Sequence, residues 1–80
     1  MENLINQLFS LAGKSWWLEI LAASPSRGYY FGPFDSENEA VQEQLRYVQT
    51  IEQEGREVLL VSVVRREAPA ERTIDYTQVA

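Results

Sequence analysis

The side chains that most often carry out enzyme chemistry are scarce in this 80-residue sequence. It contains no histidine and no cysteine, so it lacks the commonest general base near neutral pH and any thiolate nucleophile. The same absences remove the preferred protein ligands of zinc. We therefore assign no catalytic, cofactor-binding or metal-binding residue, and we expect a protein that is not an enzyme and uses no cofactor.

The remaining candidates for chemistry have ordinary structural explanations. Glu39 and Glu43 stand one helical turn apart, but paired carboxylates do acid–base work only where their surroundings separate their pKa values. Lys14 is the only lysine and could attack a substrate if it were desolvated, but we expect it to be solvated. Gly28 and Gly32 bracket an aromatic segment without the Lys-Ser/Thr pair of a phosphate-binding loop.

The charge balance narrows the classes of partner. Twelve acidic and seven basic residues give a net charge of −5, which disfavours contact with the phosphates of nucleic acid. No apolar run approaches the ~20 residues of a membrane-spanning helix, and the N-terminus lacks the basic segment of a secretory signal. We expect a single cytoplasmic domain that binds no nucleic acid and has no integral membrane span.

Two pairs of adjacent aromatic residues stand in strand-like segments. Trp16 and Trp17 form one pair, and Tyr29 and Tyr30 form the other. Because successive side chains of a strand point to opposite faces, one member of each pair should face away from the core. Exposed aromatic residues are enriched at the energetic centres of interfaces. We therefore expect a partner-binding surface here, unless the N-terminal helix or the C-terminal tail covers it.

Parity suggests which rings face the partner. The first strand has one wholly apolar face, formed by Trp16, Leu18, Ile20 and Ala22. Phe34 lies four residues after Tyr30 and shares its parity if the strand stays regular that far, so we expect Tyr30 to face inward. Tyr29 and Phe31 then join Trp17 on the second face. With the N-terminal segment, the candidate partner-binding residues are Leu4, Leu8, Phe9, Trp17, Tyr29 and Phe31.

The elements that should position these residues begin with a short helix. Residues 2–12 place apolar side chains at helical spacings, so residues 1–15 should hold an amphipathic helix ending at Gly13 in the left-handed conformation. This helix either packs on its own sheet or docks in a groove of another protein. Strands should follow over 16–23 and 29–32, joined as a hairpin by the turn residues 24–28.

The second half of the chain predicts a long helix and a strand. Ser36 and Glu39 match a capping box, and the helix from 37 to 54 should bury one apolar stripe and end at Gly55. The stripe comprises Val41, Leu45, Val48 and Ile51, with Ala40 and Tyr47 beside them. The segment 57–65 is apolar on both faces and suits a central strand, with a right-handed crossover if it is the parallel neighbour of the second strand.

We thus expect an α+β fold in which a single-layer sheet packs against one main helix. The compact ββαβ domain should span residues 16–66, after the N-terminal helix of residues 1–15. Residues 67–80 should form a tail, either extended or with a short edge strand.

The segment "SWWLEILAASPSRGYYFGPFDSENEA" resembles the cyanobacterial family called domain of unknown function 1816. With the following helix and strand, the resemblance covers about residues 16 to 64. It rests on the tryptophan strand 16–20, Pro25, the block 30–34, the helix start at Ser36 with Glu39-Ala40, and residues 52–55. It implies a cyanobacterial cytosolic setting, no enzyme activity and no functional residue that could be carried over.

A weaker resemblance is to the small capping-linker domain of phycobilisomes. It rests on Tyr30-Phe31, the helix 37–54, Gly55 and the strand 58–64; such linkers tend to be basic, whereas this chain is acidic. The two resemblances imply a non-catalytic interaction module, an accessory, linker-like or regulatory component of the photosynthetic light-harvesting apparatus, with peripheral contact to the thylakoid surface as an option. The alternative is a regulatory domain that binds a small ligand or pigment at the aromatic hairpin.

Overall fold

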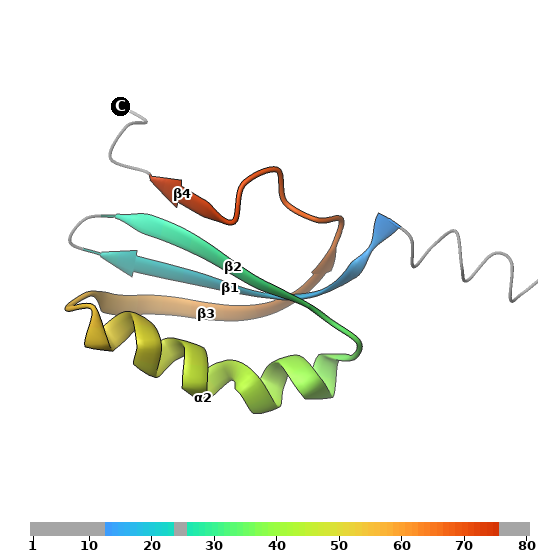
Figure 1. Cartoon of the computed structure of the whole chain (residues 1–80), viewed down its shortest axis with the longest axis horizontal. Helices are drawn as coiled ribbons and strands as arrows, with labels where there is room; N and C mark the ends of the chain where they lie inside the picture. The colour runs from blue at the N-terminus through green and yellow to red at the C-terminus, as the bar shows by residue number, and fades with distance from the viewer. Residues whose placement is uncertain (1–12, 24–25, 76–80) are drawn as a thin grey trace, which may run out of the picture.

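The structure, a computed structural model, describes residues 13–23 and 26–75. They form a four-stranded antiparallel sheet with helix α2 (Glu37–Gln53) packed on one face (Figure 1). The strands are β1 (Ser15–Ala23), β2 (Arg27–Phe34), β3 (Glu57–Arg66) and β4 (Thr73–Asp75), and their order in the sheet is β3-β1-β2-β4. The predicted α+β class is confirmed for this part of the chain.

Only the inner residues of the two predicted terminal segments are among the described residues. The predicted N-terminal helix, with Leu4, Leu8 and Phe9, falls on residues 1–12, outside the described residues. Gly13 is described but is not among the glycines with positive φ, so the expected left-handed helix end at this residue is wrong. In the predicted tail, the short edge strand is confirmed as β4, which pairs with β2.

The prediction of a central β3 is wrong. β1 lies between β2 and β3 and pairs antiparallel with both, so β2 and β3 are not neighbours. Helix α2 carries the chain back across the sheet, and β3 then joins the free side of β1 while β4 takes the outer side of β2. The apolar sequence of β3 therefore belongs to an edge strand, and its Leu59 and Leu60 are each 54% exposed.

The hairpin connection is shorter than expected. β1 ends at Ala23 and β2 begins at Arg27, which leaves residues 24–26 between the strands. Arg27 and Gly28 were expected in the turn, but they continue the ladder opposite Ala22 and Leu21.

The start and end of α2 largely follow the sequence signals. The Ser36 Oγ accepts a hydrogen bond from the Glu39 amide at 3.1 Å, as in the predicted cap. The Glu39 carboxylate accepts from the Asp35 amide at 3.1 Å. In a capping box the donor would be the amide of Ser36, one residue later. Gly55 follows the C-cap residue with a φ of 84°, so the predicted helix stop is confirmed.

The predicted stripe of α2 is buried only in part, and Tyr47 and Val48 pack at its border. Ala40 and Ile51 are buried against the sheet, whereas Val41 and Leu45 are 49% and 66% exposed. Phe34, which served to set the expected parity of β2, is buried at 7% exposure. That ring belongs to a cluster with Leu18 and Ala40, rather than lying under Val41 and Leu45.

An irregularity in β2 reverses the expected faces of its aromatic residues. Trp16 lies opposite Phe34 and Leu18 lies opposite Phe31, so β2 spans three residues where β1 spans two. The extra residue falls at the Gly32–Pro33 step, whose peptide bond is cis. Because an extra residue resets the alternation of side chains, Phe34 shares a face with Phe31. The prediction that Tyr30 faces α2 is therefore wrong.

Candidate functional site

The sheet face opposite α2, here called the open face, is covered by no helix among the described residues (Figure 1). The strand registers bring side chains from three strands together on it. Toward the hairpin end of β1, Leu21 lies between Gly28 of β2 and Leu60 of β3. The partly exposed Leu21 and the exposed Leu60 make an apolar surface that gains free energy when a partner excludes water from it.

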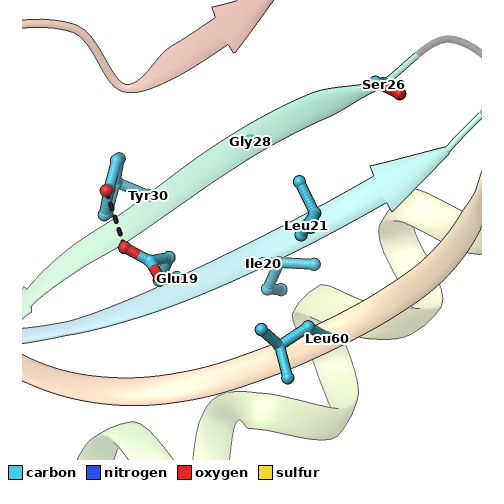
Figure 2. Close-up of a pocket in the computed structure, with 7 residues that line it drawn as sticks. All are labelled: Glu19, Ile20, Leu21, Ser26, Gly28, Tyr30 and Leu60. Atoms are coloured by element: carbon cyan, nitrogen blue, oxygen red, sulfur yellow. Dashed lines mark hydrogen bonds between the residues drawn. The ribbon is translucent and has the colours of Figure 1, made fainter. Parts of the chain in front are cut away.

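A hollow of about 380 Å³ lies on the open face, drawn in Figure 2. Its lining residues are Glu19, Ile20, Leu21, Ser26, Gly28, Tyr30 and Leu60. Gly28 has no side chain to fill the space beside Leu21, and Tyr30 stands at one end, as Figure 2 shows. The hollow is thus mainly apolar, with Tyr30 and Glu19 at one end and Ser26 at the other.

The hydrogen-bonding groups at the Tyr30 end belong to a chain of linked side chains. The Tyr30 hydroxyl donates to the Glu19 carboxylate at 2.6 Å (Figure 2). Arg66 Nη1 donates to the same hydroxyl at 2.9 Å, and the Arg66 guanidinium lies 4.8 Å from the centre of the Tyr30 ring. Linked hydrogen bonds and a cation over an aromatic ring hold side chains in defined positions. The Tyr30 end of the hollow therefore presents a prearranged acid and hydroxyl, held from outside the hollow by the Arg66 guanidinium.

The structure divides the aromatic residues that were expected to bind a partner. Trp17 lies on the open-face side as predicted, but it is 2% exposed, and the Arg72 guanidinium lies 5.5 Å from its ring centre. The predicted outward placement of Tyr29 and Phe31 is wrong, since both pack against the cluster under α2. Phe31 stacks on Tyr47 of the helix with 4.2 Å between ring centres.

Sequence reasoning missed the residues that do line the hollow. Leu21 has the parity of Trp17, which places it on the second face, but nothing in the sequence marked it as part of a site. Tyr30 was assigned to the wrong face, and Leu60 was expected to be buried in a central strand. A signal was present in Gly28, because a glycine within a strand often marks a place where a ligand or another chain approaches closely.

Two further classes of feature are absent from residues 13–23 and 26–75. No group of three or more acidic, histidine or cysteine side chains there could hold a metal ion. No helix in that part of the chain has the length and apolar character needed to cross a membrane.

Comparison with known proteins gives one match. A family model described as "Domain of unknown function (DUF1816)" matches residues 9–74, which include β1, β2, α2 and β3 in full and the first two residues of β4. No curated protein and no solved structure matches the chain.

Proposed function

We propose, from the premise that the chain belongs to the family described as domain of unknown function (DUF1816), that it is a non-catalytic protein-interaction module. The observation that carries this proposal is the open face, where Leu21 and Leu60 line a hollow that no described helix covers. Leu60 is 54% exposed, and exposed apolar surface backed by a rigid sheet is typical of a recognition surface.

The partner that fits this surface is an apolar segment of another protein. Its apolar side chains would cover Leu21 and Leu60, and a polar group at its end would meet the Tyr30 hydroxyl and the Glu19 carboxylate. Interfaces commonly combine an apolar centre with a polar rim of this kind. Because the chain carries a net charge of −5, a neutral or basic partner surface would approach it most readily.

The setting we propose is the light-harvesting apparatus of cyanobacteria, in the cytoplasm or at the thylakoid surface. This part of the proposal is supported by the resemblance of Tyr30-Phe31, the helix and the following strand to the small capping-linker domain. The chain would then act as an accessory, linker-like or regulatory component of that assembly.

The test is co-sedimentation of the purified chain with isolated phycobilisomes. Leu21→Gln keeps the side-chain volume but places an amide on the open face, and we expect it to weaken binding about tenfold, equivalent to ~1.4 kcal/mol. Leu21→Met keeps the face apolar and should bind like the wild type. Equal binding of all three chains, or no binding of the wild type, would contradict the proposal.

A second candidate function is binding of a small ligand or pigment, and the hollow itself favours it. A volume of about 380 Å³ lies within the range of ~300–1,000 Å³ that is usual for ligand sites. Titration with a linear tetrapyrrole separates the two functions. An absorbance shift that Leu21→Gln abolishes, together with unchanged phycobilisome binding, would favour the pigment site.

A further inference from the structure

The free edge of β3 is unusual for an edge strand. It is ten residues long, pairs with β1 on one side, and meets no described strand on the other. Leu59 and Leu60 on it are both more than half exposed. Proteins usually protect long apolar edges with charges, proline or bulges. Here the one irregularity lies near the start, at Leu59, because Ala22 pairs with Val58 while Leu21 pairs with Leu60.

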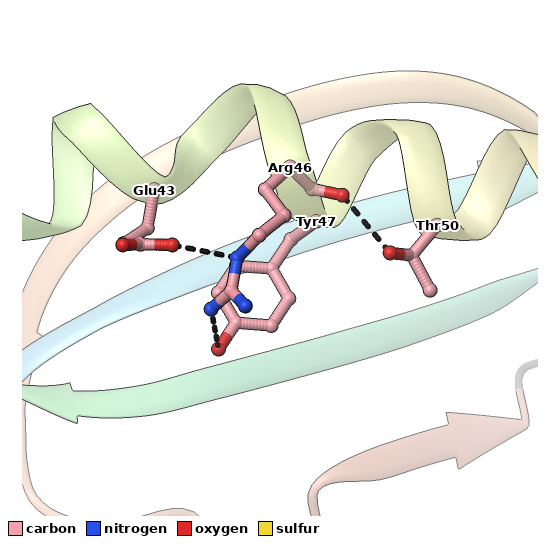
Figure 3. A network of polar contacts seen from close by, with 4 residues as sticks. All are labelled: Glu43, Arg46, Tyr47 and Thr50. Carbon is pink, nitrogen blue, oxygen red and sulfur yellow. Dashed lines mark hydrogen bonds and ion pairs between the residues drawn. The ribbon is translucent and has the colours of Figure 1, made fainter.

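Helix α2 has one polar flank and one apolar flank. Figure 3 shows the polar flank, over β2, where Arg46 Nε lies 2.7 Å from the Glu43 carboxylate. Arg46 also donates to the Tyr47 hydroxyl at 3.2 Å, and Thr50 donates to the Arg46 carbonyl. These polar contacts lie above the aromatic residues on this side of the helix.

The opposite flank of α2 lies beside β3 and has no such contacts. A groove of about 480 Å³ there is lined by Val41, Gln44, Leu45, Val48 and Val61. Val41 and Leu45 are among the four exposed large apolar residues of the described chain, and the other two are Leu59 and Leu60 on β3. All four exposed apolar side chains thus stand along the same margin of the molecule, which we call the β3 margin.

We propose that the β3 margin binds a second copy of this chain. In this dimer, the two β3 strands pair antiparallel across a two-fold axis perpendicular to the sheet, and both α2 helices lie on the same side. The Val41 and Leu45 side chains of each copy then meet those of the other between the helices. One partner would thus satisfy the free backbone groups of the edge and cover the apolar flank of α2.

The charges along β3 select this antiparallel arrangement. The strand starts at Glu57 and ends at Arg65 and Arg66, and both Glu57 and Arg65 are exposed. Antiparallel pairing brings the Glu57 end of each strand toward the Arg65-Arg66 end of the other, so the attraction between oppositely charged strand ends occurs twice. Parallel pairing would place like charges together, which is unfavourable in directly opposed strands.

The other edge of the sheet explains why assembly would stop at two copies. β4 has three residues, Thr73–Asp75. Its Asp75 carboxylate lies 3.9 Å from the guanidinium of Arg27 on the neighbouring strand β2. A short, charged strand is a poor template for pairing. Because a two-fold contact uses the same surface of both copies, the β3 margin is closed once the dimer forms.

The test is the molar mass of the full chain in solution, measured by sedimentation over rising protein concentration. We expect the wild type to reach the mass of a dimer. Leu45→Glu should shift the midpoint of dimer formation at least about tenfold upward, since it buries a carboxylate between the helices. Gln49→Glu adds the same charge at an exposed position of the same helix, and it should dimerise like the wild type.

Charge reversal tests the strand orientation. Glu57→Arg or Arg65→Glu alone should weaken dimerisation, because each makes the charges of the neighbouring strand ends less complementary at two places, and the double variant should restore it. A monomer at every concentration would overturn the proposal and leave the margin to another protein or to the chain's own terminal residues. Larger assemblies, a Leu45→Glu variant that dimerises like Gln49→Glu, or a double variant no better than the single ones would also overturn it.

Discussion

Gly32 occupies a backbone position that only glycine adopts readily. Its φ is 139°, and a Cβ atom added there would lie 3.0 Å from the Trp16 carbonyl oxygen and 3.0 Å from a ring carbon of Trp17. The first of these atoms belongs to the backbone of β1 and cannot move away by a change of rotamer. Gly55 also has a positive φ, of 84°, but nothing lies within 4 Å of its added Cβ.

Substitution by alanine should therefore lower the free energy of unfolding by different amounts at the two glycines. Gly32→Ala should lower the free energy of unfolding by about 2–4 kcal/mol, from backbone strain plus overpacking. Gly55→Ala should cost about 1–2 kcal/mol, because the left-handed conformation alone is penalised. Urea denaturation of both variants checks this order, and equal losses would show that the close approach to Trp16 and Trp17 relaxes freely.

The residue scale is also where sequence reasoning was weakest. Alternation places Tyr30 and Phe34 on one face only if β2 is regular, and the extra residue at Gly32–Pro33 breaks that condition. The Gly-Pro pair was visible in the sequence as a strand end. Whether such a pair ends a strand or inserts a residue into it depends on the partner strand, which local pattern does not include.

At the scale of the element, the start of α2 is tied down by two reciprocal hydrogen bonds. The Ser36 hydroxyl accepts from the Glu39 amide, and the Glu39 side chain accepts from the Asp35 amide, both at 3.1 Å. These are local contacts within five consecutive residues. This is why the sequence alone predicted the helix start and its cap.

Ser36→Ala should lower the free energy of unfolding by about 1 kcal/mol, because the Glu39 amide loses its acceptor. Ser36→Asp is the matched control, since aspartate accepts the same bond and places negative charge at the helix N-terminus. Thermal unfolding followed by circular dichroism measures both variants. An alanine variant as stable as the wild type would mean that water replaces the hydroxyl without loss.

The buried stripe of α2 shows where element-level reasoning stops. Helical periodicity correctly found an apolar side that includes Ile51, but that side is broader than the surface the sheet covers. Contact with the sheet falls on Ala40 and Ile51 and leaves Leu45 at 66% exposed. Periodicity gives the apolar arc of a helix, and only the position of neighbouring strands decides which part of that arc is buried.

At the scale of the whole molecule, strand order was the decisive unknown. The apolar pattern of β3 suits a central strand, yet β1 holds the inner position because it pairs with both β2 and β3. If a second copy pairs with the β3 margin, β3 becomes an inner strand of an eight-stranded sheet. Its composition would then fit its environment in the dimer, and the open face would be presented twice by one particle.

This arrangement couples self-association to folding. An unfolded chain has neither the β3 edge nor the apolar flank of α2, so dimer formation stabilises only the folded state. A tenfold rise in protein concentration favours the dimer by ~1.4 kcal/mol, or half of that per chain, which corresponds to an increase of about 3–5 °C in Tm for a domain of this size. Leu45→Glu should remove this concentration dependence, while Gln49→Glu should keep it. Calorimetric scans at several concentrations measure the effect, and a wild-type Tm that stays constant over that range would contradict a dimer held by the β3 margin.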